Sequence, residues 1–431
     1  MREILFFFDI VCPYAYTATT LINELSLKLN VRFIWRPVLL GGLYQATEAP
    51  QGAAGSATDP MSNSKRMYSA LDLARTLKRY RVPYKEGVGP TQRTLNAMRL
   101  LTSIPDQNTM ILLAHRLFNM YWYEGRDMTS IANLQEATND QQIPIDVISN
   151  IEQDRVKEEL KTNTNSAAEM GVFGVPTFQL DGKLFFGVDS IPRLAAKLGS
   201  TYVQPLRLCT HTTITRRVRL TFFYDYASPW SFFAFSQLDK VLKSVSPIQV
   251  NVEFVPVLTG GIFRTLNAPT VPVTVMPKAK VSYYMGNMMD TSEYLKLPYT
   301  YSSHFPLRSL LALRADIVSG HNIKLMTSLF SAAWQRDLDI SKQEIVSDLV
   351  EEAGLNSSNI LTSAQTDSVK SQLRANNERA VACGAFGVPT FQVDNGRIVW
   401  GQDRLNIVED LLCGWTDVDG DDNSRSVKSK L

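Results

Sequence analysis

The stretch "FGVPTFQLDGK" (residues 173–183) returns with few changes as "FGVPTFQVDNG" (residues 386–396). In both copies a Val-Pro-Thr-Phe segment precedes a short turn and a second apolar run, which is typical of two strands joined by a hairpin. A proline at the same point of both strands suggests cis peptide bonds before Pro176 and Pro389, because cis bonds are rare and usually belong to a site. Two copies in one chain predict a duplicated domain.

Other motifs repeat in the same order and at nearly the same spacing. "DIVCPYAY" begins at Asp9 and "DYASPWSF" begins at Asp225. "PVLLGG" (37–42) likewise returns as "PVLTGG" (256–261). Because order and spacing both agree, we interpret the chain as two domains, residues 1–200 and 218–413, joined by a polar linker over residues 201–217 and followed by a flexible tail over residues 414–431.

The periodicity within each half predicts a small α/β sheet. An apolar strand, a helical segment and a second strand come first, followed by a long stretch of helical periodicity. The Val-Pro-Thr strand, its hairpin partner and a closing helix complete the unit. The sequence therefore predicts a β-α-β half and a β-β-α half, with helices inserted between them.

Composition excludes several function classes. The chain has 44 Lys and Arg against 42 Asp and Glu, a net charge of +2, which is too balanced for a nucleic-acid-binding face. Its four cysteines are irregularly spaced, which favours a reducing compartment, and no zinc-type spacing predicts a metal site. No stretch approaches the roughly 18 apolar residues of a membrane helix. We expect no nucleic-acid partner, no membrane span and no metal.

Cys12 and Ser228 occupy the same place in the two halves, directly after the first strand and before a helix. Free N–H groups and the dipole at a helix start stabilise an anion, so this place would lower the pKa of the Cys12 thiol. Pro13 and Pro229 follow, and proline suits the first helical turn. A simpler interpretation is that Cys12 is a buried small residue and Ser228 a helix cap.

Taken together, the motifs resemble those of thioredoxin-fold proteins with a helical insert of the DsbA type, and among them the kappa-class glutathione transferases and 2-hydroxychromene-2-carboxylate isomerases. The resemblance covers nearly the whole chain, twice. It implies the fold class α/β, with two thioredoxin-fold domains, each carrying a helical insertion between the β-α-β half and the cis-proline β-β-α half.

In the second half, the resemblance implies a complete glutathione site. Ser228 would donate a hydrogen bond to the glutathione sulfur and favour its thiolate. Lys278 or Lys280 would meet the glycyl carboxylate. The residues that would contact the rest of the tripeptide are Pro229, Trp230, Asn267, Val388, Pro389, Gln402 and Asp403, of which the last two would hold the glutamyl end.

The first half departs from this pattern. Cys12 replaces the serine, Glu48 stands at the asparagine position and Val188 replaces a polar residue. Ala15 stands where a second cysteine would resolve a mixed disulfide, so a two-thiol cycle is impossible there. Three roles remain open for Cys12: monothiol exchange with an external thiol, a serine-like role, or a domain without catalysis. The matching residues are Pro13, Tyr14, Val175, Pro176 and Asp189.

The leading functional hypothesis is a glutathione-dependent transferase or peroxidase that acts on small electrophiles, with glutathione as co-substrate. The alternatives are a glutathione-dependent isomerase of aromatic catabolites, a thiol–disulfide oxidoreductase that uses Cys12, and a catalytically decayed scaffold. The two halves could also pair with each other. Trp122 and Trp334 occur at matching places on insertion helices and are predicted to pack in the core. The four histidines are predicted to be structural, because they show no metal or triad spacing.

The chain ends in Ser429-Lys430-Leu431. A terminal S-K-L on an exposed tail is an address that the peroxisomal import receptor reads. We therefore expect a peroxisomal protein, or a glycosomal one in a kinetoplastid, ahead of a cytosolic or mitochondrial one.

Overall fold

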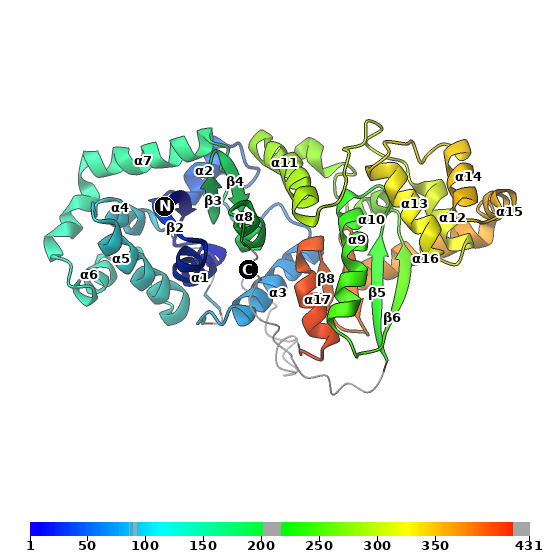
Figure 1. Ribbon diagram of the computed structural model, residues 1–431. Coiled ribbons are helices and arrows are strands. Elements are labelled where there is room, and N and C mark those ends of the chain that lie inside the picture. Colours follow the sequence, from blue (N-terminus) through cyan, green and yellow to red (C-terminus); the bar gives the residue numbers. More distant parts are fainter. Residues whose placement is uncertain (86, 89–92, 201–216, 417–431) are drawn as a thin grey trace.

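The computed structural model describes residues 1–85, 87–88, 93–200 and 217–416. The linker and tail predicted at residues 201–217 and 414–431 lie almost entirely outside this part of the chain. Each half contains a four-stranded sheet flanked by helices (Figure 1), with strand orders β2-β1-β3-β4 and β6-β5-β7-β8. In each sheet the first two strands are parallel and the other pairs are antiparallel. This is the predicted arrangement of a β-α-β half and a β-β-α half.

The first half is built in the predicted order. The elements are β1 (Arg2–Phe8), α1 (Pro13–Leu29), β2 (Val31–Pro37), α2 (Leu40–Ala46), α3 (Asn63–Arg79), α4 (Leu95–Thr102), α5 (Gln107–Asn119), a π-helix (Met120–Glu124), α6 (Ile131–Asp140), a 3₁₀ helix (Ile145–Glu152), α7 (Asp154–Glu169), β3 (Thr177–Leu180), β4 (Lys183–Phe186), a 3₁₀ turn (Val188–Ser190) and α8 (Ile191–Lys197).

The second half repeats this plan. Its elements are β5 (Val218–Tyr224), α9 (Pro229–Ser244), β6 (Val250–Pro256), α10 (Thr259–Thr265), a 3₁₀ turn (Pro272–Val275), α11 (Lys278–Leu295), α12 (Leu310–Val318), α13 (Ile323–Trp334), α14 (Gln343–Glu352), α15 (Ser357–Ser363), α16 (Asp367–Ala382), β7 (Thr390–Val393), β8 (Ile398–Trp400), a 3₁₀ turn (Gln402–Arg404) and α17 (Leu405–Leu412).

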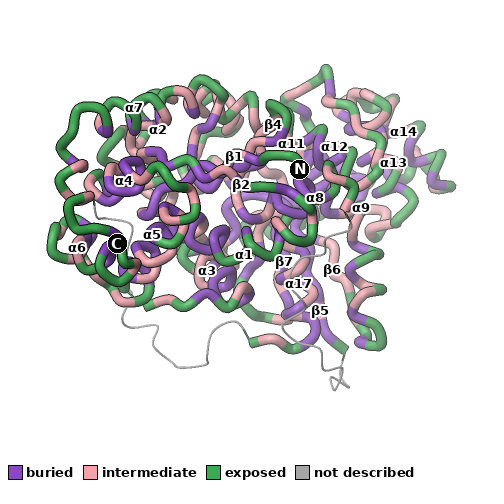
Figure 2. The backbone as a smooth tube through the Cα atoms, turned by 60° about the vertical axis from the view of Figure 1, so that its left-hand side comes forward, coloured by how far each residue is buried: buried purple, intermediate pink, exposed green. Residues whose placement is uncertain are grey.

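Helices cover both faces of the central strands, which are buried as a result (Figure 2). Trp122 and Trp334 are fully buried, so the prediction that they pack in the core is confirmed. Each indole N–H also donates to a carbonyl in the turn after the first strand, at 2.8 Å to Ile10 and 2.8 Å to Tyr226. The insertion thus anchors the turns that carry Cys12 and Ser228.

One helix of each half, α3 or α11, contacts the other half, and both helices lie in the middle of the molecule (Figure 1). From α3, the Arg75 guanidinium donates to the Ile398 carbonyl at 2.7 Å, and the Tyr68 hydroxyl pairs with the backbone of Trp400. From α11, the Tyr283 hydroxyl accepts the Phe186 N–H at 3.0 Å. A tyrosine of each half thus pairs with the outer hairpin strand of the other half.

A cluster of charges strengthens this contact. Arg404 binds Asp72 of α3 through two N–H···O contacts of 2.8 and 2.9 Å, and it binds Asp189 at 2.7 Å. Arg79 pairs with Asp410, and both side chains are almost completely buried.

None of the helices in the described ranges is long and apolar enough to cross a membrane.

Candidate functional site

The predicted cis bonds are present at Val175–Pro176 and Val388–Pro389. In each half the residue after the first strand's turn, Cys12 or Ser228, is the N-cap of the following helix. Both have extended backbone angles, and Pro13 or Pro229 begins the helix. The structure therefore places Cys12 and Ser228 as the sequence predicts, at a helix start.

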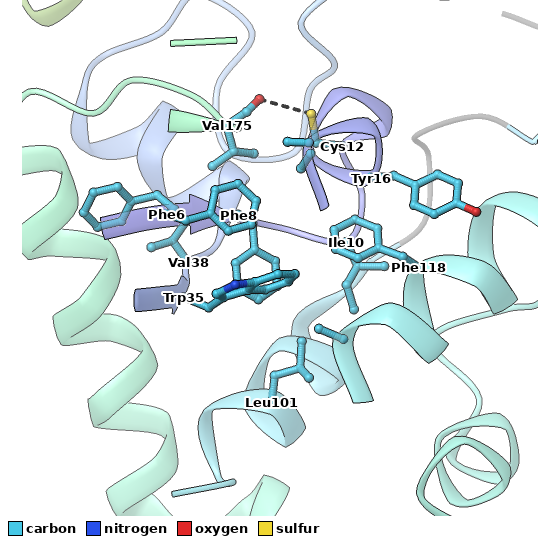
Figure 3. Close-up of a cluster of buried hydrophobic side chains, with 14 of the residues drawn as sticks. Phe6, Phe8, Ile10, Cys12, Tyr16, Trp35, Val38, Leu101, Phe118 and Val175 are labelled. Carbon is cyan, nitrogen blue, oxygen red and sulfur yellow. Dashed lines mark hydrogen bonds between the residues drawn. The ribbon is translucent and has the colours of Figure 1, made fainter. Parts of the chain in front are cut away.

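Cys12 is enclosed in the core of the first half. Its thiol donates to the Val175 carbonyl at 3.1 Å and lies against the buried cluster around Phe8, Ile10 and Tyr16 (Figure 3). Burial raises the pKa of the Cys12 thiol to about 12, although the N–H groups at the helix start pull it downward. The prediction that the helix start makes Cys12 acidic is wrong, because desolvation outweighs the helix terminus.

Ser228 is more open. Its Oγ accepts the Ser231 N–H at 3.2 Å, which is an ordinary helix cap, and its side chain is only partly buried. Among the residues that the structure describes, no acceptor is recorded for the Ser228 hydroxyl proton. The hydroxyl can therefore cap the helix and still donate one hydrogen bond to a ligand.

Two aromatic side chains, Trp230 and Tyr284, pack together near the start of α9. The Trp230 indole N–H donates to the Tyr284 hydroxyl of α11, and the two rings meet edge to face at 5.3 Å. Tyr301 and Phe305 form a second pair of partly exposed aromatic rings, with centroids 5.4 Å apart. Burial raises the pKa of Tyr284 to about 12, so its hydroxyl stays protonated at neutral pH. Our sequence reasoning missed Tyr284, since only the fold brings α11 to Trp230.

The glutamyl-end candidates differ between the halves. Gln402 accepts a hydrogen bond from Gln237 at 3.2 Å. The Asp403 side chain is 41% exposed and pairs with the neighbouring Arg404 at 3.2 Å. Asp189, the matching carboxylate of the first half, pairs with Arg404 of the second half at 2.7 Å. Both carboxylates predicted to hold a glutamyl end thus pair with Arg404, and they differ in exposure, with 26% for the Asp189 side chain against 41% for that of Asp403. Sequence reasoning also missed Arg404.

The other predicted residues lie around the two sites. Asn267 and Glu48 are exposed and share a left-handed backbone, with φ of 51° and 54°, just beyond the ends of α10 and α2. Val388 is buried beside Pro389, and Val188 is buried in the first half. Lys278 and Lys280 both lie in the first turn of α11, and burial lowers the pKa of Lys280.

A small cavity of about 100 Å³ lies where the halves meet. Tyr14 lines it from the first half and Asp403 from the second, and Lys65 lies over the Trp400 ring at 5.8 Å. The Tyr14 hydroxyl also lies 3.5 Å from Asp72. Tyr14, predicted to contact a ligand, thus faces the contact between the halves. Across the described ranges, no three His, Cys, Asp or Glu side chains are grouped so that they could hold a metal ion.

The chain is similar to proteins of known class. Human glutathione S-transferase kappa 1 is 24% identical over 220 residues, which cover 48% of this chain and 94% of that protein. Glutathione S-transferase kappa 2 of Caenorhabditis elegans is 28% identical over 223 residues, which cover 44% of this chain and 90% of that protein. A solved 2-hydroxychromene-2-carboxylate isomerase aligns at 16% identity and a TM-score of 0.39, covering 45% of this chain and 94% of the isomerase.

The family model of the DSBA-like thioredoxin domain matches this chain twice, over residues 3–199 and 219–413. Each match contains one four-stranded sheet, one cis-proline strand and one of the two N-cap residues, Cys12 or Ser228. The predicted duplication and fold class are confirmed. The chain belongs to the DSBA-like thioredoxin domain family and carries the domain twice.

Proposed function

We propose that the second half binds glutathione and uses it as a nucleophile, with Ser228 stabilising the thiolate. One observation carries this proposal. Ser228 lies at the start of α9, and no described residue accepts its hydroxyl proton. The matching Cys12 thiol, in contrast, already donates a hydrogen bond to the Val175 carbonyl. The kappa-class transferases similar to this chain act with glutathione, as their names state.

The residues of the second half suit each part of the tripeptide. The Ser228 hydroxyl would donate to the sulfur, and the N–H groups at the start of α9 would favour the negative charge there. The exposed Asp403 carboxylate, which also pairs with Arg404 at 3.2 Å, would bind the ammonium group of the glutamyl end. The backbone of Val388, before the cis-proline, would pair with the tripeptide in strand fashion.

In the reaction, the thiol proton leaves to solvent and the sulfur electron pair attacks the electrophilic carbon of the acceptor. The acceptor's leaving group departs with its bonding electrons, and a thioether remains. Trp230 and Tyr284 would hold an apolar acceptor beside the sulfur, since aromatic rings pack well against flat apolar groups. No described residue is needed as a base, because stabilising the thiolate already provides the nucleophile.

For the first half, we propose a supporting role without catalysis. Cys12 is buried and protonated, and its thiol already donates a hydrogen bond to the Val175 carbonyl. This favours the non-catalytic alternative for Cys12 over monothiol exchange, which needs an accessible thiolate. We also propose a peroxisomal location, which rests only on the terminal Ser-Lys-Leu sequence.

A second candidate function is the isomerisation of an aromatic compound with glutathione as catalyst. The aromatic pair of Trp230 and Tyr284 favours it, because Trp230 lies in the first turn of α9, whose N-cap is Ser228, and an aromatic substrate would stack there. The two functions share the thiolate and differ in its fate. In the isomerase, glutathione leaves again unchanged.

The test is glutathione conjugation to an activated chlorobenzene, measured for the wild type, Ser228→Ala and Cys12→Ala. Loss of a hydrogen bond to a charged group, about 1.5–3 kcal/mol, predicts a rate about 10- to 150-fold lower for Ser228→Ala. Cys12→Ala occupies the same place in the other half and should keep the wild-type rate. Equal rates for Ser228→Ala and the wild type would remove Ser228 from this role.

A further inference from the structure

A buried carboxylate stands at the base of each candidate turn. Asp9 and Asp225 follow the central strands β1 and β5 and are only 2% and 1% exposed. Neither residue forms an ion pair with a cation of the described chain. Burying a carboxylate without a cation costs free energy unless hydrogen bonds replace those that it made to water. The hydrogen-bond partners of Asp9 and Asp225 must therefore compensate for their burial.

Three donors from three segments surround Asp225. One oxygen accepts the Ala227 N–H at 3.0 Å, in the turn that carries Ser228, and the Ser309 hydroxyl at 2.5 Å. The other oxygen accepts the Thr259 N–H at 2.8 Å, at the start of α10. Ser309 is the N-cap of α12. The carboxylate therefore joins the Ser228 turn to the segment before Asn267 and to the helical insertion.

The first half repeats this arrangement with different residues. Asp9 accepts the Val11 N–H at 3.2 Å, the Leu40 N–H at 2.9 Å and the Thr94 hydroxyl at 2.7 Å. Thr94 is the N-cap of α4, as Ser309 is of α12. The buried carboxylate thus lies beside the partly exposed Ser228 in the second half and beside the buried Cys12 in the first half.

The charge of this group works against a nearby thiolate. In the first half, the charge of Asp9 adds to burial in raising the pKa of Cys12. By the same physics, Asp225 would disfavour a glutathione thiolate at Ser228 if charge were its only effect. Any benefit of Asp225 to the site must therefore come from the hydrogen bonds that fix the turn.

We propose that Asp225 is a positioning residue of the glutathione site, whose carboxylate holds the Ser228 turn against the start of α10 and so fixes the direction of the Ser228 hydroxyl. This inference rests on the proposed function of the second half. It goes beyond that function by giving a role to a residue that touches neither ligand nor sulfur. Asp9 keeps the same fold feature in a half without a glutathione site.

The test compares Asp225→Asn with Asp9→Asn. An amide has one acceptor oxygen and one donor nitrogen, so it can serve either Ala227 or Thr259, but not both. The pKa of the bound glutathione thiol is read from thiolate absorbance against pH, and thermal unfolding is measured in parallel. Loss of the negative charge alone would lower this pKa, whereas loss of the Ser228 position would raise it.

We expect Asp225→Asn to raise the pKa of bound glutathione by about half a unit to one unit, where one unit equals 1.36 kcal/mol. Asp9→Asn should lower the unfolding temperature about as much as Asp225→Asn does, but it should leave the pKa of bound glutathione unchanged. A lowered pKa in Asp225→Asn, or a pKa equal to that of Asp9→Asn, would overturn the inference and leave the proposed function standing.

Two further outcomes are decisive. If Asp225→Asn does not fold, Ser309→Ala removes one donor with a smaller disturbance, and Thr94→Ala is its control in the first half. A raised thiol pKa in Ser309→Ala alone supports the inference, and equal values in both variants overturn it. If the wild type binds no glutathione in calorimetry, the proposed function fails and the positioning role fails with it.

Discussion

The burial of Cys12 makes a quantitative prediction about its reactivity. Cys12 is 7% exposed, its thiol donates to the Val175 carbonyl, and burial raises the pKa of that thiol to about 12. At pH 7 a pKa of 12 leaves about one thiolate in 100,000, against about 3% for a free cysteine with a pKa of about 8.5. Because only the thiolate is nucleophilic, alkylation of Cys12 should be slower by about three orders of magnitude.

The assay is alkylation by iodoacetamide at several pH values, followed by peptide mass spectrometry of each cysteine. Cys383 is partly exposed and serves as the comparison within the folded protein. Cys12 should remain unmodified while Cys383 reacts, and both should react in denaturant, which shows that the peptide is detectable. Oxidised glutathione should likewise leave Cys12 unmodified.

Reaction of Cys12 at the rate of Cys383 in the folded protein would refute this reasoning. So would a rate that rises through a pKa below that of a free cysteine. Either result would return monothiol exchange to the first half and would mean that the helix start outweighs desolvation at this position.

Two other predictions concern the contact between the two halves, and a third concerns the last three residues of the chain. Arg404→Met leaves Asp72 and Asp189 without their buried cation, so stability in urea should fall by about 3 kcal/mol; an unchanged midpoint would contradict this. Tyr283→Phe removes the acceptor of the Phe186 N–H and should cost about 1 kcal/mol in the same assay, whereas no loss would mean that water replaces the hydroxyl. Deletion of residues 429–431 should move an N-terminally tagged fluorescent fusion from punctate organelles to cytosol without changing its melting; unchanged puncta would exclude this address.

The repeated motifs predicted the fold because local pattern and global topology agree in this chain. The Val-Pro-Thr strands, the helix-starting Pro13 and Pro229, and the β-α-β spacing are local signals, and each half contains all of them. The positions of Cys12 and Ser228 at helix starts follow from the same signals. The family match then confirmed the duplication.

The parts that could not be predicted depend on desolvation and on long-range contacts. The sequence gives no measure of how deeply Cys12 is buried, and burial reversed the predicted direction of its pKa shift. Arg404 meets Asp72 across 332 positions, and Tyr284 meets Trp230 across 54, so neither contact leaves a local pattern. The aspartate in "DYASPWSF" was visible, but only its three donors reveal what Asp225 does.

Calorimetric titration with glutathione tests the central claim most directly, because the two halves contain the same fold and differ in the proposed site. We predict that one glutathione binds per chain, that Asp403→Ala weakens binding, and that Asp189→Ala and Cys12→Ala leave the stoichiometry at one. Two equivalents per chain, loss of binding in Cys12→Ala, or no binding by the wild type would contradict the assignment of the glutathione site to the second half.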